Sequence, residues 1–187
     1  MSKKGNIFMI AGPSGVGKGT VVGELMKLDD KLWLSVSATT RSPRPGEVDG
    51  VNYHYITQEK FQKMIDEDGF LEYAGYVGNS YGTPKQPVID HCNDGYDVIL
   101  EIEVQGCMQL MGKLPAAKSI FLLPPSYEEL EKRLRGRGSE TEEKVQKRLE
   151  TARTEISKAY LYDCFVVNDN AKKAAERILK IIKQYRN

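Results

Sequence analysis

Short runs of apolar, often β-branched residues recur along the chain, mostly without strict alternation of apolar and polar positions. They lie at residues 7–11, 34–38, 97–101, 119–123 and 164–167. Unalternating runs of this length are typical of strands that are buried on both faces, as in a parallel sheet covered by helices. The pattern therefore predicts five buried core strands.

Helical patterns follow several of these runs, at residues 18–27, 126–135 and 171–185. In the last pattern, alanines and isoleucines form one stripe while lysines and arginines fill the opposite face, as expected for a helix packed on a core. Ser126 and Glu129 form a capping box that sets where the middle helix begins. Strands that alternate with helices predict an α/β fold with a parallel sheet.

The stretch from residue 41 to about residue 86 has a different character. It is rich in proline, glycine and tyrosine and has one helical pattern, near residues 57–65. Clusters of such turn-forming residues indicate short strands joined by tight connections. We interpret this stretch as an insertion, a small β-rich subdomain between the second and third core strands. A second, charged interruption begins at Gly136 and ends near Arg148.

Composition and charge exclude several classes of protein. The chain has 187 residues, of which 40% are hydrophobic and 28% charged, as in an ordinary globular protein. Its net charge of +1 draws it neither to nucleic acid nor to an anionic membrane. The apolar runs are far shorter than the roughly 20 residues of a membrane span, and the N-terminal residues do not resemble a secretory signal. We therefore expect a cytoplasmic protein with no nucleic-acid or membrane partner.

Three cysteines, Cys92, Cys107 and Cys164, are widely spaced and have no histidine clusters nearby. An odd number at such spacing indicates neither a disulfide framework nor a zinc site.

A glycine-rich loop lies between the first predicted strand and the first predicted helix. It reads Gly12-Pro13-Ser14-Gly15-Val16-Gly17-Lys18 and fits the P-loop pattern G-x-x-x-x-G-K in the context that the motif requires. Its glycines let successive N–H groups point into one concavity at a helix N-terminus, where negative charge is favoured. Lys18 would reach the β and γ phosphates. The loop therefore predicts a nucleoside triphosphate site.

The residue after Lys18 departs from the usual pattern. Gly19 stands where a Ser or Thr hydroxyl commonly binds Mg²⁺, and Thr20 follows it. We expect Thr20 or a water molecule to take that ligand position.

The kinds of side chain available indicate which group receives the phosphoryl group. A hydroxyl acceptor needs a base to take its proton, whereas a phosphate acceptor needs only positioning and charge neutralisation. The chain is rich in arginine, and its two histidines, His54 and His91, have no nucleophile-like context. This favours a kinase that acts on a phosphate.

From the P-loop to the last predicted strand, the chain resembles the guanylate kinase family in the order and spacing of its motifs. The matching segments are residues 37–47 (SATTRSPRPGE), Gly50, Tyr53, 70–74 (FLEYA), 78–83 (GNSYGT), 101–106 (EIEVQG), 133–138 (RLRGRG) and 166–169 (VVND). The resemblance implies transfer of a phosphoryl group from ATP to GMP, giving ADP and GDP, with Mg²⁺ as cofactor. It implies a P-loop core of residues 1–36, 87–135 and 149–187 around a five-stranded parallel sheet, a GMP-binding insertion at 37–86 and a short helical lid at 136–148.

The resemblance also implies roles for individual residues. ATP would be bound by Gly12, Pro13, Ser14, Gly15, Val16, Gly17, Lys18, Gly19, Thr20, Arg133, Asn168 and Asp169, and GMP by Ser37, Arg41, Arg44, Tyr53, Glu72, Tyr81, Thr83 and Glu103. The catalytic residues would be Lys18, Arg44, Arg137 and Arg148, and the metal would be held by Thr20 and Glu101, directly or through water. Family members commonly have at least one aspartate where this chain has Glu101 and Glu103, so direct metal ligation by these side chains stays open.

The implied roles agree with simple chemistry. The planar donors of Arg41 and Arg44 suit a phosphate. Glu72 would accept hydrogen bonds from the N1–H and 2-amino groups of guanine, while the hydroxyls of Ser37 and Thr83 face O6. Adenine lacks that paired donor edge, so a buried carboxylate facing it would be left unpaired.

Other interpretations remain open on the residues alone. Glu72 could simply lie on the polar face of a strand, and the balanced charges of residues 128–150 could form a salt-bridged helical surface. Some guanylate-kinase-like domains have lost catalysis and bind peptides; they typically lose P-loop or lid arginine residues, which are intact here. A kinase for another phosphorylated acceptor would have no use for the set Ser37, Glu72 and Thr83.

Overall fold

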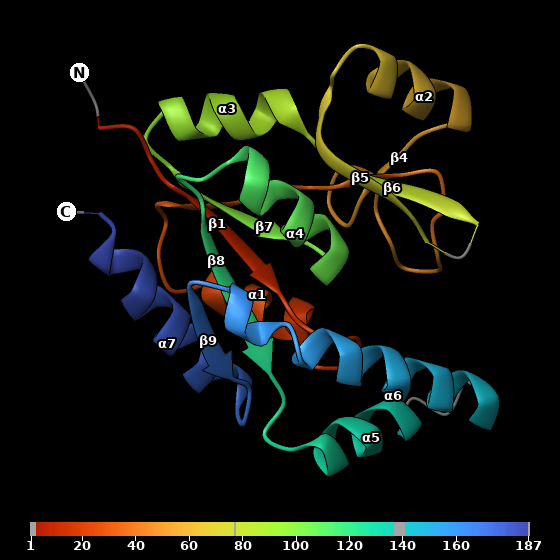
Figure 1. Ribbon diagram of the computed structural model, residues 1–187. Coiled ribbons are helices and arrows are strands. Elements are labelled where there is room, and N and C mark those ends of the chain that lie inside the picture. Colours follow the sequence, from red (N-terminus) through yellow and green to blue (C-terminus); the bar gives the residue numbers. More distant parts are fainter. Residues whose placement is uncertain (1–2, 77, 137–140, 187) are drawn as a thin grey trace.

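The core of the protein is a parallel five-stranded sheet. The structure, a computed structural model, describes residues 3–76, 78–136 and 141–186 (Figure 1). The sheet consists of β1 (Ile7–Ala11), β2 (Leu32–Leu34), β7 (Asp97–Glu101), β8 (Lys118–Leu123) and β9 (Cys164–Val167) in the order β2-β7-β1-β8-β9. All of its pairings are parallel, which confirms the predicted α/β fold.

Helices cover both faces of this sheet. On one face, α1 (Lys18–Leu25) and α7 (Ala171–Gln184) pack over Phe8, Ile10 and Ile120. On the other, α3 (Lys85–Asn93) and α4 (Val104–Lys113) pack over the remaining side chains of the same strands. The central strands β7, β1 and β8 are buried on both faces, which explains their lack of alternation. The prediction of five buried strands is wrong for the edge strand β9, where Phe165 and Val167 are exposed.

The second predicted strand is only partly correct. The apolar run at residues 34–38 is divided between two sheets: β2 ends at Leu34, and β3 (Ala38–Thr39) belongs to a second sheet. Ser35 still donates its backbone N–H to the carbonyl of Ile99, at 3.0 Å, before the chain leaves the core. The apolar run in the sequence continues across this gap because residues 35–37, which cross from one sheet to the other, are themselves buried or partly buried.

The predicted helices are present with small changes at their ends, and α3 and α4 are additional. The N-cap of the predicted capping box is confirmed: Ser126 Oγ accepts the backbone N–H of Glu129 at 3.1 Å, and α5 (Tyr127–Arg135) follows. The Glu129 side chain accepts a hydrogen bond from Arg133. The sequence patterns predict no helix at either place. α3 contains Pro87 in its first turn, where proline is tolerated, and α4 contains two glycines. Among the described residues, no helix is long and apolar enough to cross a membrane.

The second sheet lies within the expected insertion. Its strand order is β4-β3-β6-β5, with β4 (His54–Tyr55), β5 (Phe70–Tyr76) and β6 (Asn79–Pro84). The helix α2 (Gln58–Asp66) covers it and contributes Phe61 to a small core with Ala38 and Phe70. The insertion therefore has its own hydrophobic cluster.

A helical pair forms the other projection. α6 (Glu142–Ile156) packs against α5 through a cluster of Leu130, Leu134, Val145, Leu149 and Ala152. A short 3-10 helix, Ala159–Leu161, leads from α6 back toward β9. Figure 1 shows this pair and the second sheet extending from the core toward the same side of the picture. The first residues of α6 fall inside the expected lid, residues 136–148. That range therefore includes the start of a helix that packs against α5.

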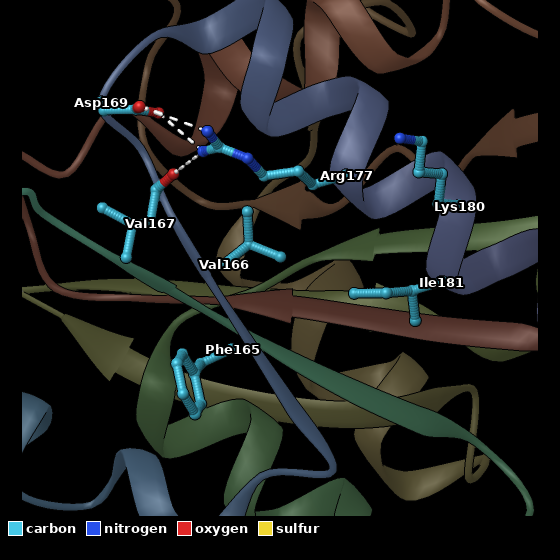
Figure 2. Close-up of a pocket in the computed structure, with 7 residues that line it drawn as sticks. All are labelled: Phe165, Val166, Val167, Asp169, Arg177, Lys180 and Ile181. Carbon is cyan, nitrogen blue, oxygen red and sulfur yellow. Dashed lines mark hydrogen bonds and ion pairs between the residues drawn. The ribbon is translucent and has the colours of Figure 1, made fainter.

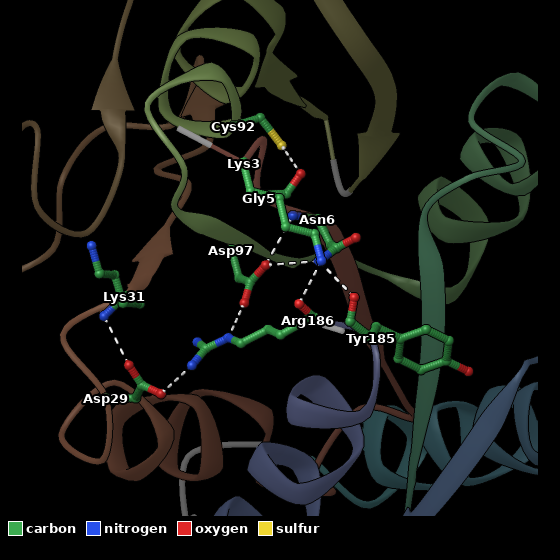
Figure 3. Close-up of polar contacts among 9 residues, drawn as sticks. All are labelled: Lys3, Gly5, Asn6, Asp29, Lys31, Cys92, Asp97, Tyr185 and Arg186. Atoms are coloured by element: carbon green, nitrogen blue, oxygen red, sulfur yellow. Dashed lines mark hydrogen bonds and ion pairs between the residues drawn. The ribbon is translucent and has the colours of Figure 1, made fainter. Parts of the chain in front are cut away.

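The two ends of the chain are tied to the core by a buried carboxylate. Asp97, at the start of β7, is 3% exposed and accepts the backbone and side-chain N–H groups of Asn6 at 2.9 and 3.1 Å (Figure 3). Arg186, just past α7, donates to Asp97 at 2.5 Å and to Asp29 at 2.6 Å. These bonds connect β1, β7 and the C-terminus.

Removing Arg186 should therefore destabilise the fold. We expect Arg186→Ala to lower the free energy of unfolding by about 3 kcal/mol, because it leaves the buried Asp97 without its cationic partner. Urea unfolding followed by circular dichroism measures this change. The control is Arg177→Ala, which removes an arginine of α7 whose ion pair with Asp169 is about half exposed, and should lower the free energy of unfolding far less. Equal losses in the two variants would contradict the proposed importance of the buried carboxylate.

Candidate active site

The predicted P-loop connects β1 to α1. Two of its glycines have left-handed backbone angles, Gly15 with φ 88° and Gly17 with φ 93°. Residues with a side chain rarely adopt such angles. At these two glycines, the angles allow the loop to fold around a concavity at the N-terminus of α1. The local structure is therefore that of an anion-binding loop.

Two residues from distant segments hold the loop by hydrogen bonds to the carbonyl of Val16. Asn168, at the end of β9, donates its side-chain N–H to the carbonyl of Val16 at 2.7 Å and is only 5% exposed. Arg133 of α5 donates to the same carbonyl and to the Asn168 carbonyl, each at 3.2 Å. A side chain at Gly17 would meet the Asn168 amide at 2.9 Å. Asn168 thus supports the loop from a buried position.

Lys18 lies inside the loop with its side chain 10% exposed. Its ammonium donates to the carbonyl of Gly12 at 3.0 Å and forms an ion pair with Glu103 at 3.4 Å. Glu103 lies just past β7, at the N-cap of α4, and its side chain is 69% exposed. The cation is therefore held in place by one fixed carbonyl and one exposed carboxylate.

The helix α6 brings a cation and an acid to the P-loop. Arg148 donates to Ser14 Oγ at 2.6 Å. Glu155, which the sequence analysis did not single out, receives a hydrogen bond from the Ser14 backbone, and burial raises the pKa of its carboxyl group. The two residues are seven apart on one helix, so they share a face. That spacing is the one signal that could have identified Glu155.

A second basic site lies in the insertion. The guanidinium of Arg41 forms two hydrogen bonds to Glu47, at 2.9 and 3.0 Å, and lies 5.4 Å from the centre of the Tyr53 ring. The Arg41 bond, with help from the Arg44 backbone N–H and the Tyr55 hydroxyl, lowers the pKa of Glu47 to about 2. The same pair raises the pKa of Arg41. Arg41 is therefore a permanently charged and oriented group.

Aromatic rings connect this cation to the core carboxylates. The Tyr53 ring lies 6.0 Å from the rings of both Tyr55 and Tyr81. Burial raises the pKa of the Tyr53 hydroxyl, and the charge of Glu101 raises it further. The structure thus brings Tyr53 of the insertion near the carboxyl end of β7. The side chain of Arg44 is exposed.

Glu72 and Thr83 face each other across the β5–β6 hairpin. They are register partners, and Thr83 Oγ1 donates to Glu72 Oε1 at 2.6 Å. Glu72 is 7% exposed and Thr83 1% exposed. Burial raises the pKa of the Glu72 carboxyl group. Ser37, the third residue of this predicted set, immediately precedes β3, and its carbonyl accepts the His54 backbone N–H.

The predicted metal ligands lie beside the P-loop. Glu101 ends β7, and its carboxylate would be 3.6 Å from a Cβ placed on Gly19. Burial raises the pKa of Glu101 while the charge of Lys18 opposes that rise. Thr20 is exposed on α1. The described residues contain no group of three or more His, Cys, Asp or Glu side chains that could bind a metal by themselves. One carboxylate beside a phosphate loop nevertheless suits Mg²⁺, which protein sites commonly bind through one or two carboxylates plus substrate phosphates.

One predicted residue lies apart from these contacts. Asp169 is exposed and pairs with Arg177 of α7 at 2.6 Å, beside a pocket on β9 and α7 (Figure 2). This pair lowers the pKa of Asp169 to about 2. Arg137 lies outside the described residues.

Comparisons with known proteins show the family to which the chain belongs. The family model described as guanylate kinase matches residues 4–185. A guanylate kinase of Synechocystis sp. is 51% identical over 97% of this chain and 95% of its own length, and one of Clostridioides difficile is 50% identical over 99% and 90%. A crystal structure of guanylate kinase from Anaplasma phagocytophilum, 31% identical, superposes with a TM-score of 0.80 over 98% of this chain and 87% of that one. The chain belongs to the guanylate kinase family.

Proposed function

We propose how the residues of this guanylate kinase transfer the γ-phosphoryl group of ATP to GMP. The observation that carries the assignment is the buried pair of Glu72 and Thr83. A buried carboxylate is costly unless hydrogen-bond donors satisfy it, and Thr83 supplies donors from its hydroxyl and its backbone. In our proposal, the guanine base supplies two further donors to the same carboxylate.

The guanine edge matches this pair. The carboxylate of Glu72 accepts the N1–H and 2-amino groups, and the Ser37 hydroxyl donates to O6. The Thr83 hydroxyl lies near O6 but keeps its single proton on Glu72 Oε1. Adenine at the same place would leave Glu72 buried with no donor beyond Thr83. The pair therefore selects the base by the cost of leaving a charge unsatisfied.

The GMP phosphate is held by Arg41, Arg44, Tyr53 and Tyr81. Glu47 fixes the orientation of Arg41, and the rings of Tyr53 and Tyr81 lie beside its guanidinium group and near the end of β7. A planar, oriented guanidinium grips phosphate oxygens with little loss of side-chain entropy. This arrangement would hold the acceptor phosphate facing the P-loop, with Glu103 beside the substrate.

The ATP phosphates occupy the P-loop from Gly12 to Thr20. Lys18, released from the exposed Glu103, binds the β and γ phosphates. Arg133 and Arg148, which already contact the loop, add positive charge at the transferring group, and Arg137 of the proposed lid, residues 136–148, completes the set. Because the acceptor is an anion, no general base is required, and catalysis depends on positioning and charge neutralisation.

Magnesium fits the same place. Glu101 and Thr20 would hold it, directly or through water, and it would neutralise phosphate charge. Asn168 and Asp169 follow β9 on the far side of the loop and form the proposed boundary of the adenine site.

The test of base selection is the variant Glu72→Gln. We expect wild-type enzyme to convert GMP far faster than AMP in an assay of ADP release. In Glu72→Gln, kcat/KM for GMP should fall about 100-fold, because charged hydrogen bonds to the base are lost. Equal wild-type rates with GMP and AMP would contradict the specificity, and wild-type kinetics in the variant would remove Glu72 from the site. No turnover with any monophosphate would favour a peptide-binding module or another acceptor.

The raised pKa of Glu72 predicts a pH effect on GMP binding. Burial holds this pKa above the ordinary value of 4.5, and only the ionised carboxylate accepts two hydrogen bonds. The KM for GMP should therefore rise as the pH falls toward and through that pKa. The Glu72→Gln variant controls for titration of the phosphate of GMP, which affects both enzymes alike. If both enzymes have the same pH profile, Glu72 does not bind the base in its ionised form.

Loss of Lys18 tests the phosphate site. We expect Lys18→Ala to lower kcat about 100-fold to 1000-fold, as removal of one group that stabilises transition-state charge does elsewhere. Circular dichroism should remain unchanged, because the exposed Glu103 is easily solvated once its partner is gone. The control, Lys27→Ala, removes an exposed lysine of a surface pair and should retain wild-type turnover. Wild-type turnover in Lys18→Ala would exclude this residue from the mechanism.

A further inference from the structure

A glycine of α4 lies directly against the carboxylate of Glu72. Gly106 is buried in the first turn of α4, which packs against β5. A Cβ atom at this position would lie 2.7 Å from Glu72 Oε2 and 3.1 Å from Glu72 Cδ. The first distance is shorter than real Cβ contacts, so no larger side chain fits without a displacement.

The displacement would fall on the carboxylate and not on the helix. Val104, Cys107 and Leu110 anchor α4 in the core and are each at most 3% exposed. The end of a glutamate side chain moves more easily than a helix fixed at three positions. However, Thr83 holds Glu72 Oε1 at 2.6 Å, so the carboxylate cannot turn away without weakening that bond.

The geometry points to Gly106 as a positioning residue for guanine specificity: its missing side chain leaves the space in which the Glu72 carboxylate is held for the base. Thr83 fixes one oxygen, and the surface of Gly106 limits where the other one lies. This inference rests on the proposed role of Glu72 in binding GMP.

The composition of α4 agrees with this role. Glycine is unfavourable inside a helix, and α4 has two glycines, Gly106 and Gly112. Gly112 is exposed, and a Cβ atom there would meet nothing within 4 Å. Only the buried one is required by close packing, which makes Gly112 a matched control on the same helix.

The experiment compares Gly106→Ala with Gly112→Ala. We expect Gly106→Ala to raise the KM for GMP about tenfold or more, the effect of losing one good hydrogen bond, while the KM for ATP stays within about twofold. The preference for GMP over IMP, which lacks the 2-amino group, should shrink. Gly112→Ala should leave all of these values unchanged. An unchanged KM for GMP in Gly106→Ala, or an equal rise in both KM values, would overturn the inference.

The double variant Glu72→Ala/Gly106→Ala separates positioning from general damage. Because Gly106 acts through Glu72, adding Gly106→Ala to Glu72→Ala should not raise the KM for GMP further. If Gly106→Ala alone is unstable, Glu72→Ala should restore its thermal midpoint, since it removes the carboxylate that clashes. A further rise in KM, or no restoration, would contradict the inference.

The proposed role of Glu72 is tested separately, by the KM for GMP of the Glu72→Gln variant. If Glu72→Gln leaves the KM for GMP unchanged, the role of Glu72 fails and the inference fails with it. If Glu72→Gln raises that KM and Gly106→Ala does not, the inference alone is wrong.

Discussion

The carbonyl of Val16 is the point on which the active site depends. Gly15 and Gly17 let the loop adopt positive φ without strain, but glycines also leave a loop many other conformations, and here Asn168 and Arg133 both donate to this one oxygen and restrict it. Asn168 immediately follows the last core strand, β9, and Arg133 belongs to α5. The phosphate loop, the edge of the sheet and the base of the proposed lid are therefore connected through a single hydrogen-bonded group.

The parts of the molecule that could be predicted from the sequence are those that a local pattern specifies. Core strands buried on both faces leave continuous apolar runs, and a P-loop has fixed residues between a strand and a helix, so both were readable from local pattern. The run at 34–38 was wrongly predicted as one core strand, because the residues that connect the two sheets are also partly apolar. The contact of Asn168 with Val16 joins residues 152 positions apart, and no local pattern contains it.

The acceptor site shows the same limit. The resemblance to guanylate kinases named Glu72 and Thr83, but their pairing depends on a register that shifts between Phe70 and Glu72. A shift of one residue would place Glu72 on the other face of the strand. The space at Gly106 depends in turn on how α4 packs against β5. A glycine in a helical sequence is normally read as a weak point, and only the tertiary structure shows that a carboxylate lies against it.

The charged groups of the site already have internal partners of their own. Lys18 pairs with Glu103, Arg41 with Glu47, and Arg148 donates to Ser14. These contacts keep the long side chains oriented, so a substrate phosphate meets groups that need little reorganisation. The partners differ in burial: Glu103 is largely exposed, whereas Glu47 is one-fifth exposed and receives further hydrogen bonds. Under the proposed mechanism, a phosphate therefore displaces Glu103 from Lys18 at a lower cost than it would displace Glu47 from Arg41, and Glu47 keeps Arg41 oriented.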